Sequence, residues 1–182
     1  MASLRCVEGW LGLSEASERP AFSPGELRAA QPQLFASLLG ALAGPTASDA
    51  VVEAATQVLL ALFSGGGGGG GEAEERAACC ALLGMLGALG PRLADAPSET
   101  LPLAVARLGA AAAEGYTEEC AGGAAEAAQS LSQAMLRCLA ARDPGVAEAA
   151  VDYFLALNTG ERGAGPRRDW INGTGLSFPA AR

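Results

Sequence analysis

The sequence predicts an all-α protein, an α-solenoid in which antiparallel helix pairs stack one on the next. Half of the residues are hydrophobic, but only 5% are aromatic and Ile occurs once. Ala and Leu dominate the apolar set and favour helices, whereas strands prefer the β-branched and aromatic residues that are scarce here. Apolar residues also recur at spacings of three and four, which places them on one helix face, and we expect about seven helices.

Three helices are expected before a run of glycines. Apolar spacing predicts the first over Leu4–Leu11 and the second over Leu34–Leu42, with a polar loop at 14–25 between them. Gly44 followed by Pro is a common helix stop, and residues 46–49 can cap the third helix. The apolar face of the third helix consists of Val51, Ala55, Val58, Leu59 and Leu62.

A flexible Gly-rich linker is predicted at residues 64–71. Seven consecutive glycines, from Gly65 to Gly71, have no side chains that could pack. A phosphate-binding loop is the sharper alternative, but such a loop follows a strand and precedes a Gly-Lys-Ser/Thr motif, and neither is found here. We therefore expect one solenoid segment over residues 1–160, interrupted by the linker at 64–71, and an irregular tail over 161–182.

Two helices are expected directly after the linker. Glu72 opens the first, because acidic residues stabilise the positive end of a helix dipole, and Gly90 with Pro91 breaks or kinks it. The second runs from Thr100 to Ala113, with a proline that is tolerated only in its first turn. The apolar face of the first helix consists of Cys79, Leu82, Leu83, Leu86 and Leu89.

The last two predicted helices flank a tight turn. Gly122 and Gly123 delay the first of them to Ala124. Asp143 can cap the second, and the Asn-Thr-Gly sequence at 158–160 ends it. The two apolar stripes consist of Ala124, Ala128, Leu131, Met135 and Leu139, and of Val146, Ala150, Tyr153, Phe154 and Leu157.

An internal repeat supports the stacking of helix pairs. Residues 51–62 and 146–157 are identical at seven of twelve positions, at an offset of 95 residues. The preceding stripes align as well, Leu34–Leu42 with Leu131–Leu139. This offset is two periods of about 47 residues, which is the spacing of HEAT and armadillo repeats. A single helix pair of this kind cannot bury its apolar face alone, so neighbouring pairs must stack.

Composition excludes several classes of function. The chain has 12 basic and 20 acidic residues, a net charge of −8, and no Lys, which argues against nucleic-acid binding. With no His, a Cys/His zinc site is impossible, and the five Cys lack paired CxxC motifs. We therefore expect no metal and no cofactor, and interpret the Cys residues as small core hydrophobes in a reducing compartment.

Neither catalysis nor membrane insertion is expected. No His base or nucleophile elbow is found, and acidic pairs such as Glu74 and Glu75 fit helix starts better than acid–base chemistry, so we expect no enzyme. The apolar stretch 77–90 is shorter than the roughly 20 residues that span a bilayer, which favours a buried helix.

Three acidic residues are candidates for contact with a basic partner. Glu53 follows the cap at Asp49, and Glu148 and Asp152 follow the cap at Asp143, at equivalent or neighbouring positions of the repeat. These acids could face a basic protein, or they could simply form the solvated side of their helices.

Four segments of the chain follow one another in the order of a known family. Leu4–Leu11 resembles an "RCxxSW" helix, and Leu34–Leu42 followed by Ser48–Ala55 resembles the next repeat of that family. Glu75–Leu93 is similar to a further helix, and Asp143–Leu157 to an "HPxxxVxxxxFxFWxxL" element. The family is the transportin-SR branch of the importin-β (karyopherin) superfamily.

The resemblance implies a nuclear transport receptor of the cytoplasm and nucleus. Such receptors wrap basic protein cargo, often Arg/Ser-rich, and release it on binding the GTP form of Ran. Ran binds mainly through N-terminal repeats that would precede Met1, so we expect the chain to be an internal fragment or a truncated gene product. The alternative is a HEAT-type scaffold in another complex, such as a phosphatase or a tubulin-binding platform, because fold does not fix function.

We expect this chain alone not to support import regulated by Ran. The test is a pull-down of the purified chain with Ran loaded with GTP or GDP. Binding that depends on the nucleotide would contradict the expectation.

Overall fold

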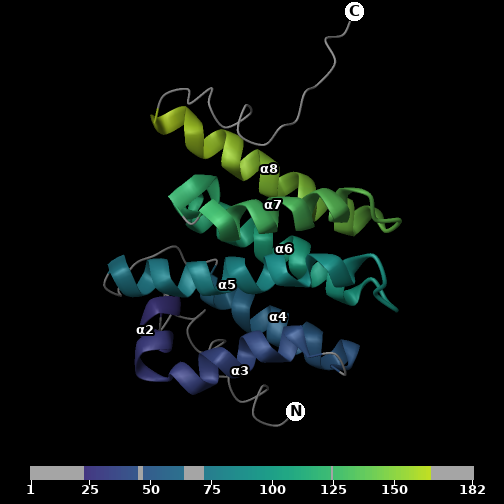
Figure 1. The fold of residues 1–182 in the computed structure, drawn as a ribbon, viewed down its shortest axis with the longest axis horizontal. Helices are drawn as coiled ribbons and strands as arrows, with labels where there is room; N and C mark the ends of the chain where they lie inside the picture. The colour runs from purple at the N-terminus through teal and green to yellow at the C-terminus, as the bar shows by residue number, and fades with distance from the viewer. Residues whose placement is uncertain (1–22, 45–46, 64–71, 124, 165–182) are drawn as a thin grey trace, which may run out of the picture.

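The computed structural model describes residues 23–44, 47–63, 72–123 and 125–164, and in these residues the chain is all-α (Figure 1). Seven α-helices and one short π-helix make up the described part of the chain, which contains no strand. From residue 32 onwards the helices follow one another from one end of the molecule to the other in chain order (Figure 1). The expected helix at Leu4–Leu11, the glycine linker and the tail from 165 onwards lie outside the described residues.

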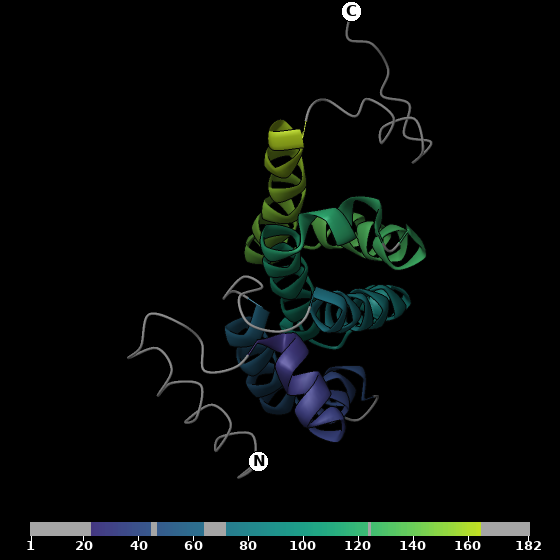
Figure 2. The same cartoon turned by 90° about the vertical axis from the view of Figure 1, so that its left-hand side faces the viewer.

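The helices lie in two layers. Figure 2 shows one layer that consists of α3 (Pro32–Ala43), α5 (Glu72–Leu93) and α7 (Ala125–Leu139). The other layer consists of α4 (Asp49–Phe63), α6 (Thr100–Gly115) and α8 (Pro144–Ala164). Contacts run along both layers, because α5 packs on α7, and α6 packs on both α4 and α8. Successive helices along the chain alternate between the layers, so each connection carries the chain from one layer to the other.

The first pair of helices is preceded by a short helix that the sequence did not predict. Helix α2 (Pro24–Ala30) begins inside the expected loop, because Ser23 caps it. The Ser23 hydroxyl accepts a hydrogen bond from the Glu26 amide at 3.1 Å, and the Glu26 carboxylate accepts one from the Ser23 amide at 2.9 Å. This reciprocal capping box satisfies two backbone donors that would otherwise be unpaired. Helices α3 (Pro32–Ala43) and α4 (Asp49–Phe63) follow where they were predicted.

The sequence predicted that the helix breaks or kinks at Gly90 and Pro91, but helix α5 (Glu72–Leu93) does not break there. The helix continues through Pro91 for two further residues. A proline this close to the C-terminal end removes one backbone hydrogen bond, which is a smaller loss than the same residue would cause in the middle of the helix. Helix α6 (Thr100–Gly115) starts at the predicted residue and ends two residues later than expected, where the Tyr116 amide donates to Ala112 O at 2.8 Å.

The C-terminal helices agree with the predicted starts but not with every predicted end. A π-helix, η1 (Glu119–Gly123), was not predicted and precedes α7 (Ala125–Leu139). Asp143 caps α8 (Pro144–Ala164) as expected, accepting from the Gly145 amide at 2.7 Å. Helix α8 continues past the expected stop at 158–160, so the prediction of an irregular chain from residue 161 was wrong for its first four residues.

One apolar core runs through both layers. The predicted stripe of α5 is buried, and so is that of α8 except for Phe154, which is partly buried. Three of the four described Cys side chains are buried as well, at Cys79, Cys120 and Cys138. Cys80 is only partly buried and Cys6 lies outside the described residues. The stripe predicted for α7 is wrong at Leu139, which is 37% exposed, because Ala134 and Cys138 turn toward the core instead.

Glycines allow α5 and α7 to approach closely. A Cβ atom at Gly87 of α5 would lie 2.6 Å from the Ser130 Cβ and 3.1 Å from the Leu131 backbone N, both in α7. At Gly84, one turn earlier in α5, a Cβ would meet no atom within 4 Å. Two glycines of one helix therefore stand in opposite environments, one at a tight contact and one in open space.

This contrast predicts opposite effects of the same substitution. Gly84→Ala should stabilise the protein by about 0.5–1 kcal/mol, because Ala loses less backbone entropy in a helix than Gly. Gly87→Ala should destabilise it by about 1–3 kcal/mol, because the added methyl group forces α7 away from α5. Urea denaturation followed by circular dichroism measures both changes. Equal effects of the two substitutions would contradict the described packing of α5 on α7.

Candidate functional site

The three acidic residues singled out in the sequence are all exposed, but they do not form one site. Glu53 lies on α4, whereas Glu148 and Asp152 lie on α8. Only Asp152 lines a described groove, and its acidic neighbour there is Glu114 of α6, which the sequence did not indicate. Glu53 and Glu148 are not among the residues that line this groove.

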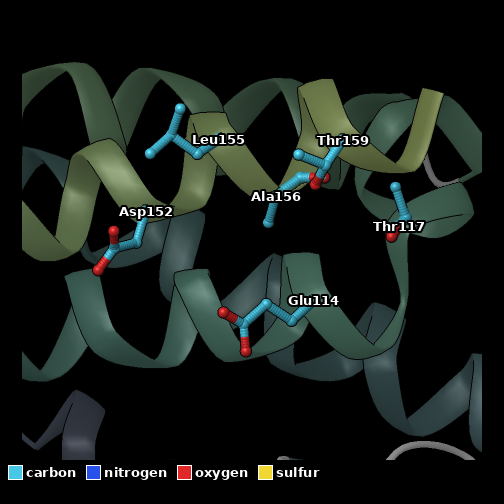
Figure 3. Close-up of a pocket in the computed structure, with 6 residues that line it drawn as sticks. All are labelled: Glu114, Thr117, Asp152, Leu155, Ala156 and Thr159. Carbon is cyan, nitrogen blue, oxygen red and sulfur yellow. The ribbon is translucent and has the colours of Figure 1, made fainter. Parts of the chain in front are cut away.

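The groove lies between α6 and α8, as Figure 3 shows, and has a volume of about 450 Å³. Asp152 and Leu155 lie toward one end of it, Thr159 and Thr117 toward the other, and Glu114 lies between them on the α6 side (Figure 3). This order means that α6 and α8 run in the same direction along the groove. We name this surface the α6–α8 groove; it is lined by Glu114, Thr117, Asp152, Leu155, Ala156 and Thr159.

The contact of α6 with α8 fixes the two sides of the groove. Helix α6 buries a run of small residues, Ala110–Ala113, which lets neighbouring helices approach its backbone. Helix α8 buries Val146, Ala150 and Leu157. Asp152 and Leu155 point away from this buried face, because they lie at intermediate positions of the helical turn. The acidic and apolar groups of the groove are therefore held by rigid helices.

The two hydroxyl groups of the groove are already hydrogen-bonded. Thr117 Oγ1 donates to Ala113 O at 2.8 Å, and Thr159 Oγ1 donates to Ala156 O at 3.0 Å. Each hydroxyl thus uses its proton within its own segment and presents only acceptor lone pairs outward. The groove consequently offers hydrogen-bond acceptors to a ligand that carries donors.

The electrostatic character of the groove is negative. Among the described residues, neither Glu114 nor Asp152 has a salt-bridge or hydrogen-bond partner. Glu114 is the second-last residue of α6, where the unpaired carbonyl groups at the helix end add partial negative charge. A cation in the groove would be attracted by the carboxylates that line it.

An apolar surface adjoins the carboxylates. Leu155 lines the groove and is 53% exposed, and Val151, on the neighbouring turn of α8, is 44% exposed. Arg and Lys side chains have an apolar stem and a charged head, so they can cover such a surface and pair with an adjacent acid. The groove therefore fits a basic side chain better than a small metal ion. In the described residues, no group of three or more potential metal ligands gathers.

Glu75, one of the acidic residues that the sequence analysis assigned to a helix start, is buried. Glu74 is exposed as expected, but Glu75 is 6% exposed and accepts a hydrogen bond from the Tyr116 hydroxyl at 2.9 Å. Its other carboxyl oxygen has no partner among the described residues. Gly25 packs on this position, since a Cβ there would lie 2.7 Å from the Glu75 backbone N.

The contact of Tyr116 with Glu75 ties α5 to the end of α6. Tyr116 also packs edge-on against Phe63 of α4, with ring centroids 5.7 Å apart. Burial, followed by the hydrogen bond to Glu75, raises the pKa of Tyr116 well above its ordinary value. Sequence reasoning missed this pair, because the spacing of 41 residues between the two side chains leaves no local signal.

No described helix is both long enough and apolar enough to cross a lipid bilayer.

Removing the Tyr116 hydroxyl should destabilise the fold. Tyr116→Phe leaves the buried Glu75 carboxyl group without its donor, and we expect a loss of about 1–3 kcal/mol at neutral pH. Because the pKa of Tyr116 is raised in the folded state, this stabilisation is present below the ordinary pKa of about 10 and is lost as the pH rises further. The stability difference between the wild type and the variant should therefore shrink above that pH.

Tyr153→Phe is the control for the Tyr116 variant. Its hydroxyl contacts Ser132 Oγ at 3.0 Å, a partner that is only partly buried and uncharged. We expect the control to cost about 0.5–1.5 kcal/mol, measured by urea denaturation at several pH values. A Tyr116→Phe protein as stable as the wild type would show that Glu75 does not depend on this hydrogen bond.

Comparison of the chain with protein-family models, curated proteins and solved structures finds no match. The resemblance to the importin-β superfamily consequently stays a prediction from the sequence.

Proposed function

We propose that this chain is a protein-binding segment of an α-solenoid and that its α6–α8 groove holds a basic segment of a partner protein. The observation that carries the proposal is the pair of unpartnered carboxylates, Glu114 and Asp152, that line one groove beside the exposed Leu155. A guanidinium group could pair with either carboxylate while its stem covers the apolar surface.

The arrangement of the helices supports the solenoid proposal. Helix pairs that stack in two layers, with like helices in contact along each layer, are what a HEAT or armadillo repeat requires. Residues 51–62 and 146–157, which match in sequence, also occupy the same layer, in α4 and α8. An elongated stack of this kind presents a long surface to another protein.

Together with the sequence resemblance, the groove supports the function of a nuclear transport receptor segment. The cargo would be a basic or Arg/Ser-rich protein, carried between cytoplasm and nucleus, with Ran acting mainly through repeats outside this chain. Of the three acidic residues that the sequence suggested for contact with cargo, only Asp152 also lines the groove. Glu53 and Glu148 would at most contribute to the field around the groove.

A structural scaffold in another protein complex is the second candidate. The observation in its favour is the group of exposed apolar side chains on α7 and α8, namely Leu136, Leu139, Val151 and Leu155. Exposed apolar patches mark protein–protein contact sites that need no charge complementarity. Binding to a basic peptide would then be weak, and a stable partner complex would resist salt.

A peptide-binding experiment tests the proposed function. The probe is a fluorescent peptide of alternating Arg and Ser, titrated with the full chain at low salt and at 0.5 M salt. The variant Glu114→Gln/Asp152→Asn should bind about tenfold more weakly at low salt, because it removes both carboxylates from the groove. The difference should shrink at high salt, where exposed charges are screened.

The matched control is Glu74→Gln/Glu126→Gln, which removes the same net charge from two exposed residues outside the groove. We expect it to bind within about twofold of the wild type, because distant exposed charges are mostly screened. Equal weakening by both double variants would show that only net charge attracts the peptide. No binding by the wild type, alongside a salt-resistant protein partner, would favour the scaffold.

A further inference from the structure

A second cavity lies at the opposite end of α6. It has a volume of about 510 Å³ and forms where the connection between α5 and α6 meets the connection between α7 and α8. Ser98, Glu99 and Pro102 line it at the start of α6, and Arg137 and Arg142 line it from the side of α7. Its volume is in the range of ordinary ligand pockets.

Gly90 lets the guanidinium group of Arg137 lie close to α5. A Cβ atom at Gly90 would lie 2.8 Å from Nη1 of Arg137, so the guanidinium group contacts the bare backbone of α5. Gly90 itself is buried, whereas Arg137 is exposed to solvent. Arg137 can therefore reach a ligand in the cavity while one side of its guanidinium group contacts a neighbouring helix.

Neither arginine of the cavity is neutralised by a carboxylate in the part of the chain that the structure describes. Among the described residues, no carboxylate lies within salt-bridge distance of Arg137 or Arg142, although Glu99 lines the same cavity. Cys138 adds no charge, because burial raises the pKa of its thiol to about 11 and its Sγ lies 3.8 Å from Pro102 O.

Arg92, in contrast, is an arginine whose guanidinium group has a structural role within the fold. It lies near the end of α5, as Arg137 lies near the end of α7. Its guanidinium group donates to Ala43 O at 2.5 Å and to Gly44 O at 3.2 Å, and so caps the C-terminal end of α3. Arg137 makes no such bond within the described residues, which leaves its donors available to a ligand.

We propose that this cavity binds carboxylate side chains of an acidic protein segment through Arg137 and Arg142. Guanidinium groups bind carboxylates with two parallel hydrogen bonds, and this cavity contributes two such groups. Leu93 and Ala141 supply an apolar wall that fits an apolar residue between the acids. Glu99 in the lining and the net charge of −8 disfavour nucleic acid, whose charge density is far higher.

This inference goes beyond the proposed function, since the cavity and the α6–α8 groove contain different residues and attract opposite charges. A partner with a basic and an acidic segment could engage both ends of α6 at once. The two sites are tested separately, because the acidic peptide and the Arg/Ser peptide each report on one of them.

The test uses a fluorescent peptide of Glu residues with one central Leu, titrated with the full chain at low salt. Arg137→Gln/Arg142→Gln should weaken its binding by about tenfold or more, because both guanidinium donors are lost. Arg28→Gln/Arg107→Gln removes the same charge outside the cavity and should change the affinity by less than about twofold. Equal weakening by the two double variants would overturn the proposal.

Gly90→Ala tests the position of the guanidinium group without changing any charge. The added methyl group meets only the flexible end of Arg137 and a small contact with Ala134, at 3.4 Å, so the fold should tolerate it. Thermal unfolding should show a stability close to that of the wild type, while affinity for the acidic peptide falls by about threefold or more. Unchanged affinity in a folded Gly90→Ala protein would overturn the assignment to Arg137.

Competition with inorganic phosphate distinguishes a site for the carboxylates of a protein segment from a site for small free anions. At a concentration of anion equal to that of the peptide carboxylates, phosphate should leave the peptide bound, because it cannot use the apolar wall or both arginines over the length of the cavity. Displacement of the peptide by phosphate at that concentration would overturn the assignment to an acidic protein segment and indicate a small-anion site. Absence of peptide binding to the wild type would overturn the proposal itself.

Discussion

The close approach of helix backbones is the constraint on which this structure depends. With 5% aromatic residues, the chain cannot fill wide gaps between helices with large side chains. Helix α6 contacts α4, α5, α7 and α8, and it buries Gly109 together with the alanines 110–113. A Cβ at Gly109 would lie 2.7 Å from the Met135 Cε atom of α7. Small residues thus replace large ones as the means of excluding water, since dense packing requires that no gap remain.

This constraint also explains where charge gathers. Four helices pack around α6, and the two described hollows lie near its ends. Glu114 lies at the C-terminal end, beside carbonyl groups that carry partial negative charge, and Arg137 and Arg142 line the cavity at the start of the helix. Glu114 opposes the dipole of α6, at a cost of about 0.3–1 kcal/mol, whereas Arg137 lies in the last turn of α7, where a cation is favourable. Folding alone therefore does not favour the position of Glu114, and binding of a complementary charge would offset its cost.

Apolar periodicity predicted most helices, because burial repeats with the helical turn. The start of α6 at Thr100 and the cap at Asp143 followed from local chemistry alone. The end of α8 did not, because a Gly within an Asn-Thr-Gly stop is a preference that a continuing helix can override. Of the candidate site, Asp152 could be named from its helix position, but its neighbour Glu114 could not. Pairing α6 with α8 requires knowledge of which helices lie side by side.

The internal repeat allows the exposed face of α8 to be compared with the equivalent face of α4. At the offset of 95 residues, Val151 and Leu155 correspond to Thr56 and Leu60 of α4. Thr56 is 5% exposed, whereas Val151 is 44% exposed and Leu155 53%. Helix α4 is covered by α6, and no described helix lies on α8 in the same way.

The surface that stacks helix pairs in the first copy is therefore open in the second, with Asp152 added where α4 has Gln57. Gln57 is exposed although α6 covers α4, so a repeat unit stacked on α8 would leave Asp152 in solvent in the same way. Asp152 thus lies at the edge of the open apolar face formed by Val151 and Leu155, where a partner that covers the apolar side chains can also bring a cation to the carboxylate.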